Sequence, residues 1–361
     1  MPLNPASISN IFSTTQRIGV ELRGSPLLCR PTEFIGVEIE LEQANLNVRG
    51  DRIRWPDTDP ATRGLVEAHV DGSLRNGIEL VFSQPLFGLQ ALAAIDYMFA
   101  IKQHNNLTDS VRTSTHIHVN YSDVTPDVVV RAAAINAIIE PYIVGTAGSH
   151  REANCYAVSM RGSDFLTNNR TEYAIQDFVI HQANSHRYLG FNMAALAKYG
   201  TIEYRYFGGL ERDSVVALVN MLLEQKTVAL SAVNVPYVLE QYPTIREFIF
   251  NTLPHAAAFL KLDSVSHEDD VAWRDEVLAR LHGASVFSDA FSLYEGEHDY
   301  EEEPAEHTGS DEYTVHADDI PMPDDAIFSS RLVNRAGGAL SSSYPEPIQV
   351  VPDSNFAEDV R

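Results

Sequence analysis

Cysteine, lysine and long apolar runs are all scarce in this 361-residue chain. The two cysteines, Cys29 and Cys155, make no disulfide framework and have no metal-ligand spacing to each other, so the sequence suits a reducing compartment. No apolar run approaches the length of a membrane span, and Met1 to Phe12 lacks a signal-peptide pattern. We therefore expect a cytoplasmic protein without a membrane partner.

Basic side chains are outnumbered, with 26 Lys and Arg against 50 Asp and Glu. The resulting net charge of −24 argues against nucleic acid as a partner, because nucleic-acid binding requires a basic footprint. Only four of the basic residues are lysines. Any phosphate that this protein handles would therefore be bound mainly by arginine, whose planar fork suits phosphate oxygens.

Three common signatures of catalysis and phosphate binding are also missing. The sequence contains no G-x-x-x-x-G-K-[ST] loop, no G-x-G-x-x-G after an expected strand and no G-x-S-x-G elbow. Cys155 with a distant histidine is too general a pattern to define a nucleophile. A nucleotide bound here would depend on arginines and on metal ions held by carboxylates.

Residues 34–42 show the clearest pattern in the chain. If they form a strand, successive side chains alternate between its two faces. Apolar residues then occupy one face, and Glu38, Glu40 and Glu42 occupy the other. Carboxylates about 7 Å apart along one strand face repel each other unless something cationic neutralises them.

Other expected strands repeat this design of an apolar face opposite a face of charged or imidazole groups. Residues 77–82 place Glu79 on that face, residues 115–121 place His116, His118 and Asn120 there, and residues 200–207 place Glu203 and Arg205. An antiparallel sheet with one solvated face shows such alternation without any function. A solvated face normally includes lysine, however, and none occurs here. Divalent cations would offset the repulsion among these carboxylates.

The choice of metal follows from the ligand types. A surplus of carboxylates favours a hard ion such as Mg²⁺, with Mn²⁺ as a substitute, because these ions take carboxylate and nucleotide phosphate oxygens together. Zinc is the alternative, since His116 and His118 are of the type that ligates it, but no cysteine accompanies them.

The composition divides the chain into an N-terminal extension (1–30), one region large enough for a catalytic domain (31–285) and an acidic tail (286–361). Residues 289–330 contain no Lys or Arg, so we expect the tail to be disordered and solubilising. Docking of a protein partner to the tail is the alternative.

Within the central region, helices are expected to alternate with the strands. One starts at residues 83–85 and runs to about His104, one starts at Thr125-Pro126, and one starts at Asp213. The second of these is expected to bend or end near Pro141. We therefore expect an α+β fold, with an antiparallel sheet packed by helices.

Four motifs in order resemble the carboxylate–amine ligase superfamily, which includes glutamine synthetase and glutamate–cysteine ligase. They are Gly36-Val37-Glu38-Ile39-Glu40, Asp71-Gly72-Ser73 with Glu79 eight residues on, His116-x-His118, and Thr201-Ile202-Glu203-x-Arg205. Within that superfamily, the sequence is most similar to the amidoligase family of phages, bacteria and fungi. The similarity covers roughly residues 33–235, and it implies a curved, glutamine-synthetase-like sheet.

The resemblance also implies a role for each matched residue. The implied metal ligands are Glu38, Glu40, Asp71, Glu79 and Glu203, and Asp71 is shorter than the glutamate that relatives have there. His116 and its companion His118 would lie near the nucleotide phosphates. Arg205 would face the transferred phosphoryl group, so that Arg205, His116 and Glu203 form the catalytic set.

Substrate contacts are implied for two further segments. Arg151 and Asn154, in Ser149-His150-Arg151-Glu152-Ala153-Asn154-Cys155-Tyr156, resemble a substrate-loop motif, and Arg151 would also reach the nucleotide. Asn192 resembles a pocket position. Glu42 has no counterpart and is interpreted as a surface residue at the strand end.

The implied activity is ATP-dependent amide formation through an acyl phosphate, in the cytoplasm of the host if a phage encodes the protein. A small-molecule or peptide carboxylate and an amine would be the substrates, and Tyr188 or an acidic residue would take the amine proton. Two alternatives stay open. One is a metal-dependent hydrolase, and the other is a non-enzymatic phage or interaction protein with a decayed site.

Overall fold

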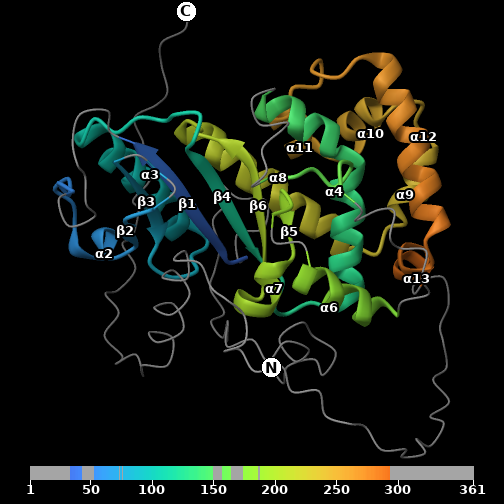
Figure 1. Cartoon of the computed structure of the whole chain (residues 1–361), viewed down its shortest axis with the longest axis horizontal. Helices are drawn as coiled ribbons and strands as arrows, with labels where there is room; N and C mark the ends of the chain where they lie inside the picture. The colour runs from blue at the N-terminus through green and yellow to red at the C-terminus, as the bar shows by residue number, and fades with distance from the viewer. Residues whose placement is uncertain are drawn as a thin grey trace, which may run out of the picture.

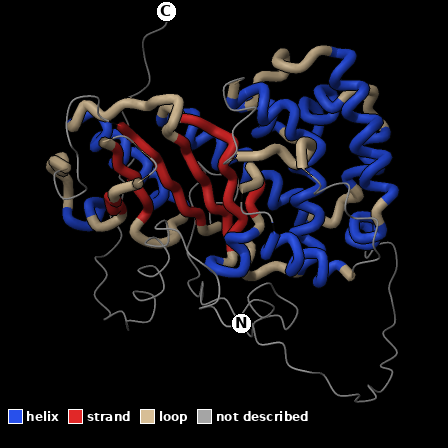
Figure 2. Tube along the Cα trace, viewed as in Figure 1, coloured by secondary structure: helices blue, strands red, loops and turns tan. Residues whose placement is uncertain are grey.

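A six-stranded antiparallel sheet forms the centre of the computed structural model, with strands in the order β2-β3-β1-β4-β6-β5 (Figures 1 and 2). The structure describes residues 33–42, 53–72, 74, 76–148, 157–163, 174–185 and 188–292. The strands are β1 (Ile35–Glu42), β2 (Val66–His69), β3 (Gly77–Phe82), β4 (Ser114–Asn120), β5 (Phe191–Asn192) and β6 (Thr201–Gly208). Because β2 and β5 lie at opposite edges, the sheet is open. The expected α+β class is confirmed.

Helices α3, α4 and α8 pack against the sheet, and the later helices gather beside it, around α4 (Figures 1 and 2). The helices are α2 (Pro60–Arg63), α3 (Gly88–His104), α4 (Pro126–Ala147), α6 (Ile175–Ser185), α7 (Ala194–Tyr199), α8 (Arg212–Leu230), α9 (Val235–Glu240), α10 (Ile245–Thr252), α11 (Pro254–Phe259), α12 (His267–Gly283) and α13 (Ser285–Ser292). The apolar faces of the strands and the inner faces of these helices form one core.

Helix α4 departs from expectation because it continues through Pro141 to Ala147. Proline has no N–H, so the carbonyl of Ala137 loses its usual helical donor. The indole Nε1 of the buried Trp273 donates to that carbonyl at 3.1 Å. A side chain of α12 thus satisfies the group that Pro141 leaves open, and the helix continues.

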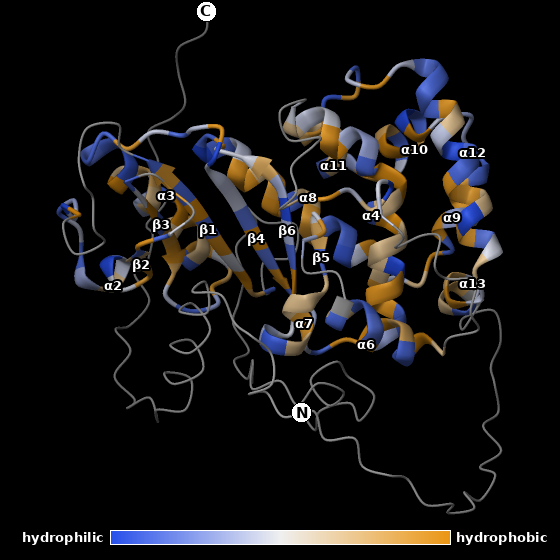
Figure 3. Cartoon of the chain, in the orientation of Figure 1, coloured by the Kyte–Doolittle hydropathy of each residue, from blue (hydrophilic) through white to orange (hydrophobic). Residues whose placement is uncertain are grey.

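The same helix corrects the expectation that no segment approaches the length of a membrane span. By length and composition, Pro126–Ala147 passes that test, but 83% of its most apolar window is buried inside the molecule. Figure 3 shows its apolar character beside the hydrophilic α12. A buried core helix has both properties, and α4 packs beside β6 at one side of the sheet (Figure 1).

Two element boundaries also differ from those expected. Helix α3 begins at Gly88 rather than at residues 83–85, where residues 83–87 still connect it to β3. The expected end of the central region at residue 285 falls at the start of α13. Phe287 and Phe291 of that helix are buried, so the packed part of the chain extends to residue 291.

Candidate functional site

The sheet order brings the four sequence motifs onto one face. Strand β1 lies between β3 and β4, and β4 also pairs with β6. The register pairs on this face are Glu38 with His116, Glu40 with Glu79, and His118 with Glu203. Residues paired in register on antiparallel strands are close neighbours, so side chains from four strands converge on one region.

A β-bulge beside His116 places Arg205 within this region. The register between β4 and β6 shifts between Thr115 and Ile117, so that Arg205 and Tyr206 together face His116. A bulge redirects side chains locally, and here Arg205 Nη1 donates to Glu203 Oε1 at 3.0 Å. The side chain of Tyr206 lies on the opposite face of the sheet, where its buried hydroxyl donates to Glu140 of α4.

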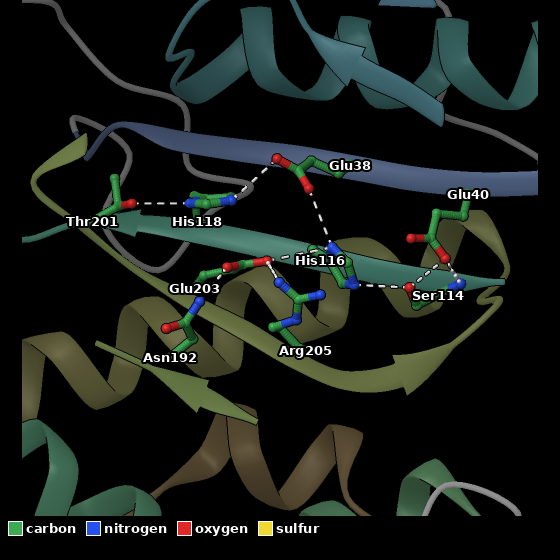
Figure 4. Close-up of polar contacts among 9 residues, drawn as sticks. All are labelled: Glu38, Glu40, Ser114, His116, His118, Asn192, Thr201, Glu203 and Arg205. Carbon is green, nitrogen blue, oxygen red and sulfur yellow. Dashed lines mark hydrogen bonds and ion pairs between the residues drawn. The ribbon is translucent and has the colours of Figure 1, made fainter. Parts of the chain in front are cut away.

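His116 lies at the centre of the cluster, between β1 and β6 (Figure 4). Its Nδ1 is 3.2 Å from Glu38 Oε2 and 3.4 Å from Glu203 Oε1. Its Nε2 is 2.8 Å from the hydroxyl oxygen of Ser114, and that hydroxyl donates its hydrogen to Glu40. The imidazole of His116 therefore contacts Glu38 and Glu203 directly, and it is linked to Glu40 through Ser114.

His118 and Asn192 contact two carboxylates of the cluster, Glu38 and Glu203 respectively. Nε2 of His118 is 3.2 Å from Glu38 Oε1, and its Nδ1 is 2.9 Å from the Thr201 hydroxyl. Asn192 lies on β5, where its amide donates to Glu203 Oε2 at 2.7 Å. Asn192 thus orients a carboxylate of the cluster.

Two of the carboxylates are stabilised in the ionised form. Burial raises the pKa of Glu38, but the charges and hydrogen bonds of His118 and His116 outweigh it, and the pKa lies well below the usual range. Burial also opposes ionisation of Glu203, yet Arg205 and the two histidines keep its pKa lowered. Conversely, Glu38 and Glu203 outweigh burial and raise the pKa of His118.

Two other carboxylates lack such compensation. Burial raises the pKa of Glu79 far above its usual value, and the nearby Glu38, Glu40, Asp71 and Glu203 raise it further. Burial likewise raises the pKa of Glu40, although His116 and Ser114 counteract it. Without a bound cation, the carboxyl groups on the β3 side of the cluster are therefore harder to ionise than Glu38 and Glu203.

Ligand atoms in this region lie close enough together to hold metal ions. Three groups have all their ligand atoms within 4.8 Å of one another, namely Glu38–Glu79–His116, Glu38–His118–Glu203 and Glu40–Asp71–Glu79. Each group has at least two carboxylates, which is the donor set of a hard divalent cation. The residues present therefore fit Mg²⁺ or Mn²⁺. Glu42 belongs to none of the groups found among the described residues.

A metal-dependent change in pH sensitivity is expected from the raised pKa of Glu79. In the metal-free protein, the folded state retains a proton that the unfolded state has lost, so this contribution to stability falls as pH rises above about 4.5. Mg²⁺ would bind the ionised carboxylate instead, so the gain in melting temperature with Mg²⁺ should be larger at about pH 8 than at about pH 5. Melting curves by circular dichroism with Mg²⁺ or EDTA measure this. An equal gain in Glu79→Gln and in wild type would contradict it, and Glu42→Gln serves as the matched control.

Sequence reasoning missed several residues of the cluster. Ser114 and Thr201 contact the two histidines, and hydroxyl residues at strand ends give no local signal of such contacts. Glu67 and His69 of β2 pair with Val81 and Glu79 of β3, which extends the polar face to the sheet edge. The alternation in residues 66–69 was a usable signal for this extension.

The expected substrate residues Arg151 and Asn154 lie outside the described residues.

No protein-family model matches this chain, and a search of curated proteins gave no match either. The geometry of the cluster therefore carries the functional interpretation.

Proposed function

We propose that this protein is an ATP- and Mg²⁺-dependent carboxylate–amine ligase, an amidoligase with a glutamine-synthetase-like sheet. The observation that most supports this is the cluster of five carboxylates, two histidines and Arg205 on one face of an antiparallel sheet, in which Glu38, Glu40, Glu203 and both histidines are buried and the other members are partly buried. Such a surplus of negative charge in a buried region is costly unless cations bind there. Polyphosphate accompanied by divalent cations is a ligand that suits both the carboxylates and the arginine.

The proposed reaction has two steps. The substrate carboxylate attacks the γ-phosphorus of ATP, forming an acyl phosphate and releasing ADP. The amine then attacks the acyl carbon, the C–O bond to phosphate breaks, and the nitrogen loses a proton as the amide forms. Little covalent work by the protein is required, which agrees with the lack of a nucleophile motif.

Each part of the cluster has a role in the first step. The carboxylates Glu38, Glu79 and Glu203 would hold the divalent cations, which when bound neutralise charge on phosphate oxygens. The Arg205 guanidinium, held by Glu203, would bind the transferred phosphoryl group.

The test is ADP release with Mg²⁺ across a panel of amino acids and peptides. Sustained release over many turnovers should require both a carboxylate and an amine, and Glu38→Gln should reduce it about 100-fold or more, because a ligand charge shared by two of the metal groups is lost. Glu42→Gln, on the same strand outside those groups, should stay close to wild type. Full activity in Glu38→Gln would refute the proposal. Absence of ATP binding together with tight Zn²⁺ retention would indicate a metal-dependent hydrolase instead.

A further inference from the structure

Ser114 is the first residue of β4 and contacts two members of the cluster at once (Figure 4). Its backbone N–H donates to Glu40 Oε2 at 2.8 Å, and its hydroxyl lies 2.5 Å from the same oxygen. The hydroxyl is also 2.8 Å from Nε2 of His116. Ser114, Glu40 and His116 are each more than nine-tenths buried, so these contacts replace contacts with water.

The direction of each hydrogen bond follows from counting protons. A backbone amide can only donate, so Glu40 Oε2 is an acceptor at this point. A serine hydroxyl has a single hydrogen, and the shorter of its two contacts directs that hydrogen to the same carboxylate oxygen. The hydroxyl oxygen must then accept from His116, which places a hydrogen on Nε2 of the imidazole.

The other ring nitrogen is directed at carboxylates. Nδ1 of His116 lies 3.2 Å from Glu38 Oε2 and 3.4 Å from Glu203 Oε1, and ionised carboxylates only accept. In a neutral ring with hydrogen on Nε2, the Nδ1 lone pair would face both of these oxygens. These carboxylates oppose that arrangement and the Ser114 contact favours it, and a cation among the oxygens would remove the opposition.

We propose that Ser114 is a positioning residue that fixes His116 in its Nε2–H tautomer and so presents Nδ1 as the metal-ligating nitrogen. Its amide and hydroxyl also fix the orientation of Glu40, so one residue organises ligands on two strands. The inference rests on the metal site of the proposed function and adds how that site is prepared for the ion. Partners of this kind orient ligating histidines and raise metal affinity.

The first test reads the tautomer without any metal. Nuclear magnetic resonance of ¹⁵N-histidine in the full chain, with His116→Gln to assign the signals, should show hydrogen on Nε2 of His116 when the ring is neutral. Ser114→Ala removes the hydroxyl but keeps the amide, and its His116 should shift toward the Nδ1–H tautomer. Ser114→Thr retains a hydroxyl and should behave as wild type. Hydrogen on Nδ1 in the wild type, or no shift in Ser114→Ala, would overturn the inference.

The second test uses Mn²⁺ as the probe, with affinity measured by electron paramagnetic resonance. Ser114→Ala should bind Mn²⁺ about 10-fold to 100-fold more weakly than wild type, and Ser114→Thr should restore binding. Ser83→Ala is the control. Ser83 directly follows β3, and its hydroxyl donates to the carbonyl of Gly64, which lies outside the cluster. Equal affinity in Ser114→Ala and wild type would overturn the role of Ser114. A wild type that shows the predicted tautomer but binds no Mn²⁺ would instead refute the metal site of the proposed function.

Discussion

Replacement of Arg205 by alanine is expected to reduce ATP-dependent amide formation by about 10³-fold or more and to leave the protein folded. Burial disfavours the charge of Arg205, but Glu203, Glu38 and Glu40 outweigh it and raise its pKa, so the guanidinium stays ionised. In the proposed reaction, this fixed positive charge would stabilise the negative charge that develops on the transferred phosphoryl group. Rates of ADP and amide formation, with circular dichroism as a check of folding, measure the effect.

Two further variants separate the role of Arg205 from charge in general. Arg205→Lys keeps the charge but loses the planar fork, so its rate should fall between those of wild type and Arg205→Ala. Arg212→Ala removes an arginine at the start of α8 that pairs with Asp96 and Asp213 outside the cluster, and it should leave the rate unchanged. A rate for Arg205→Ala within a few-fold of wild type would refute the role in phosphoryl transfer.

Replacement of Lys226 by methionine should give the largest loss of stability, about 3–5 kcal/mol. The Lys226 ammonium on α8 is fully buried and donates to Glu33 Oε2 at 2.5 Å and to the Asn120 carbonyl at 2.6 Å. Methionine fills similar volume but leaves the Glu33 carboxylate buried without its cation. Urea unfolding followed by circular dichroism measures the difference.

The control for Lys226 is another lysine of the same chain. Lys261 is exposed, so Lys261→Met should change the urea midpoint little. Adding Glu33→Gln to Lys226→Met removes the uncompensated charge and should recover part of the lost stability. Equal midpoints for Lys226→Met and Lys261→Met would show that the buried pair contributes nothing to stability.

Local alternation was sufficient to predict which residues share a face. Glu38 and Glu40 on β1, and Glu203 and Arg205 on β6, occupy the polar face as the period of two indicates. This part was predictable because alternation is a property of each strand by itself. The α+β class followed for the same reason, from strands and helices recognised one at a time.

Features that depend on distant parts of the chain could not be predicted in this way. The bulge that sets both Arg205 and Tyr206 opposite His116 is a property of the pairing of β4 with β6, and neither strand shows it alone. Continuation of α4 through Pro141 requires an indole 136 residues away from Ala137. The burial of Lys226 depends similarly on Glu33, which is 193 residues distant in sequence.

The strand order has a consequence for how the protein is made. Strand β4 meets β1 and β6 through contacts such as His116 with Glu38 and His118 with Thr201, which are 78 and 83 residues apart. Long-range pairings of this kind form slowly, and β6 is the last in chain order of the strands among the described residues. A nascent chain that ends before β6 lacks both Glu203 and Arg205, and with them the ion pair that these two residues form in the finished cluster. The Glu38–His118–Glu203 group therefore exists only in chains that extend through β6, and a cation bound there would favour those chains over shorter ones.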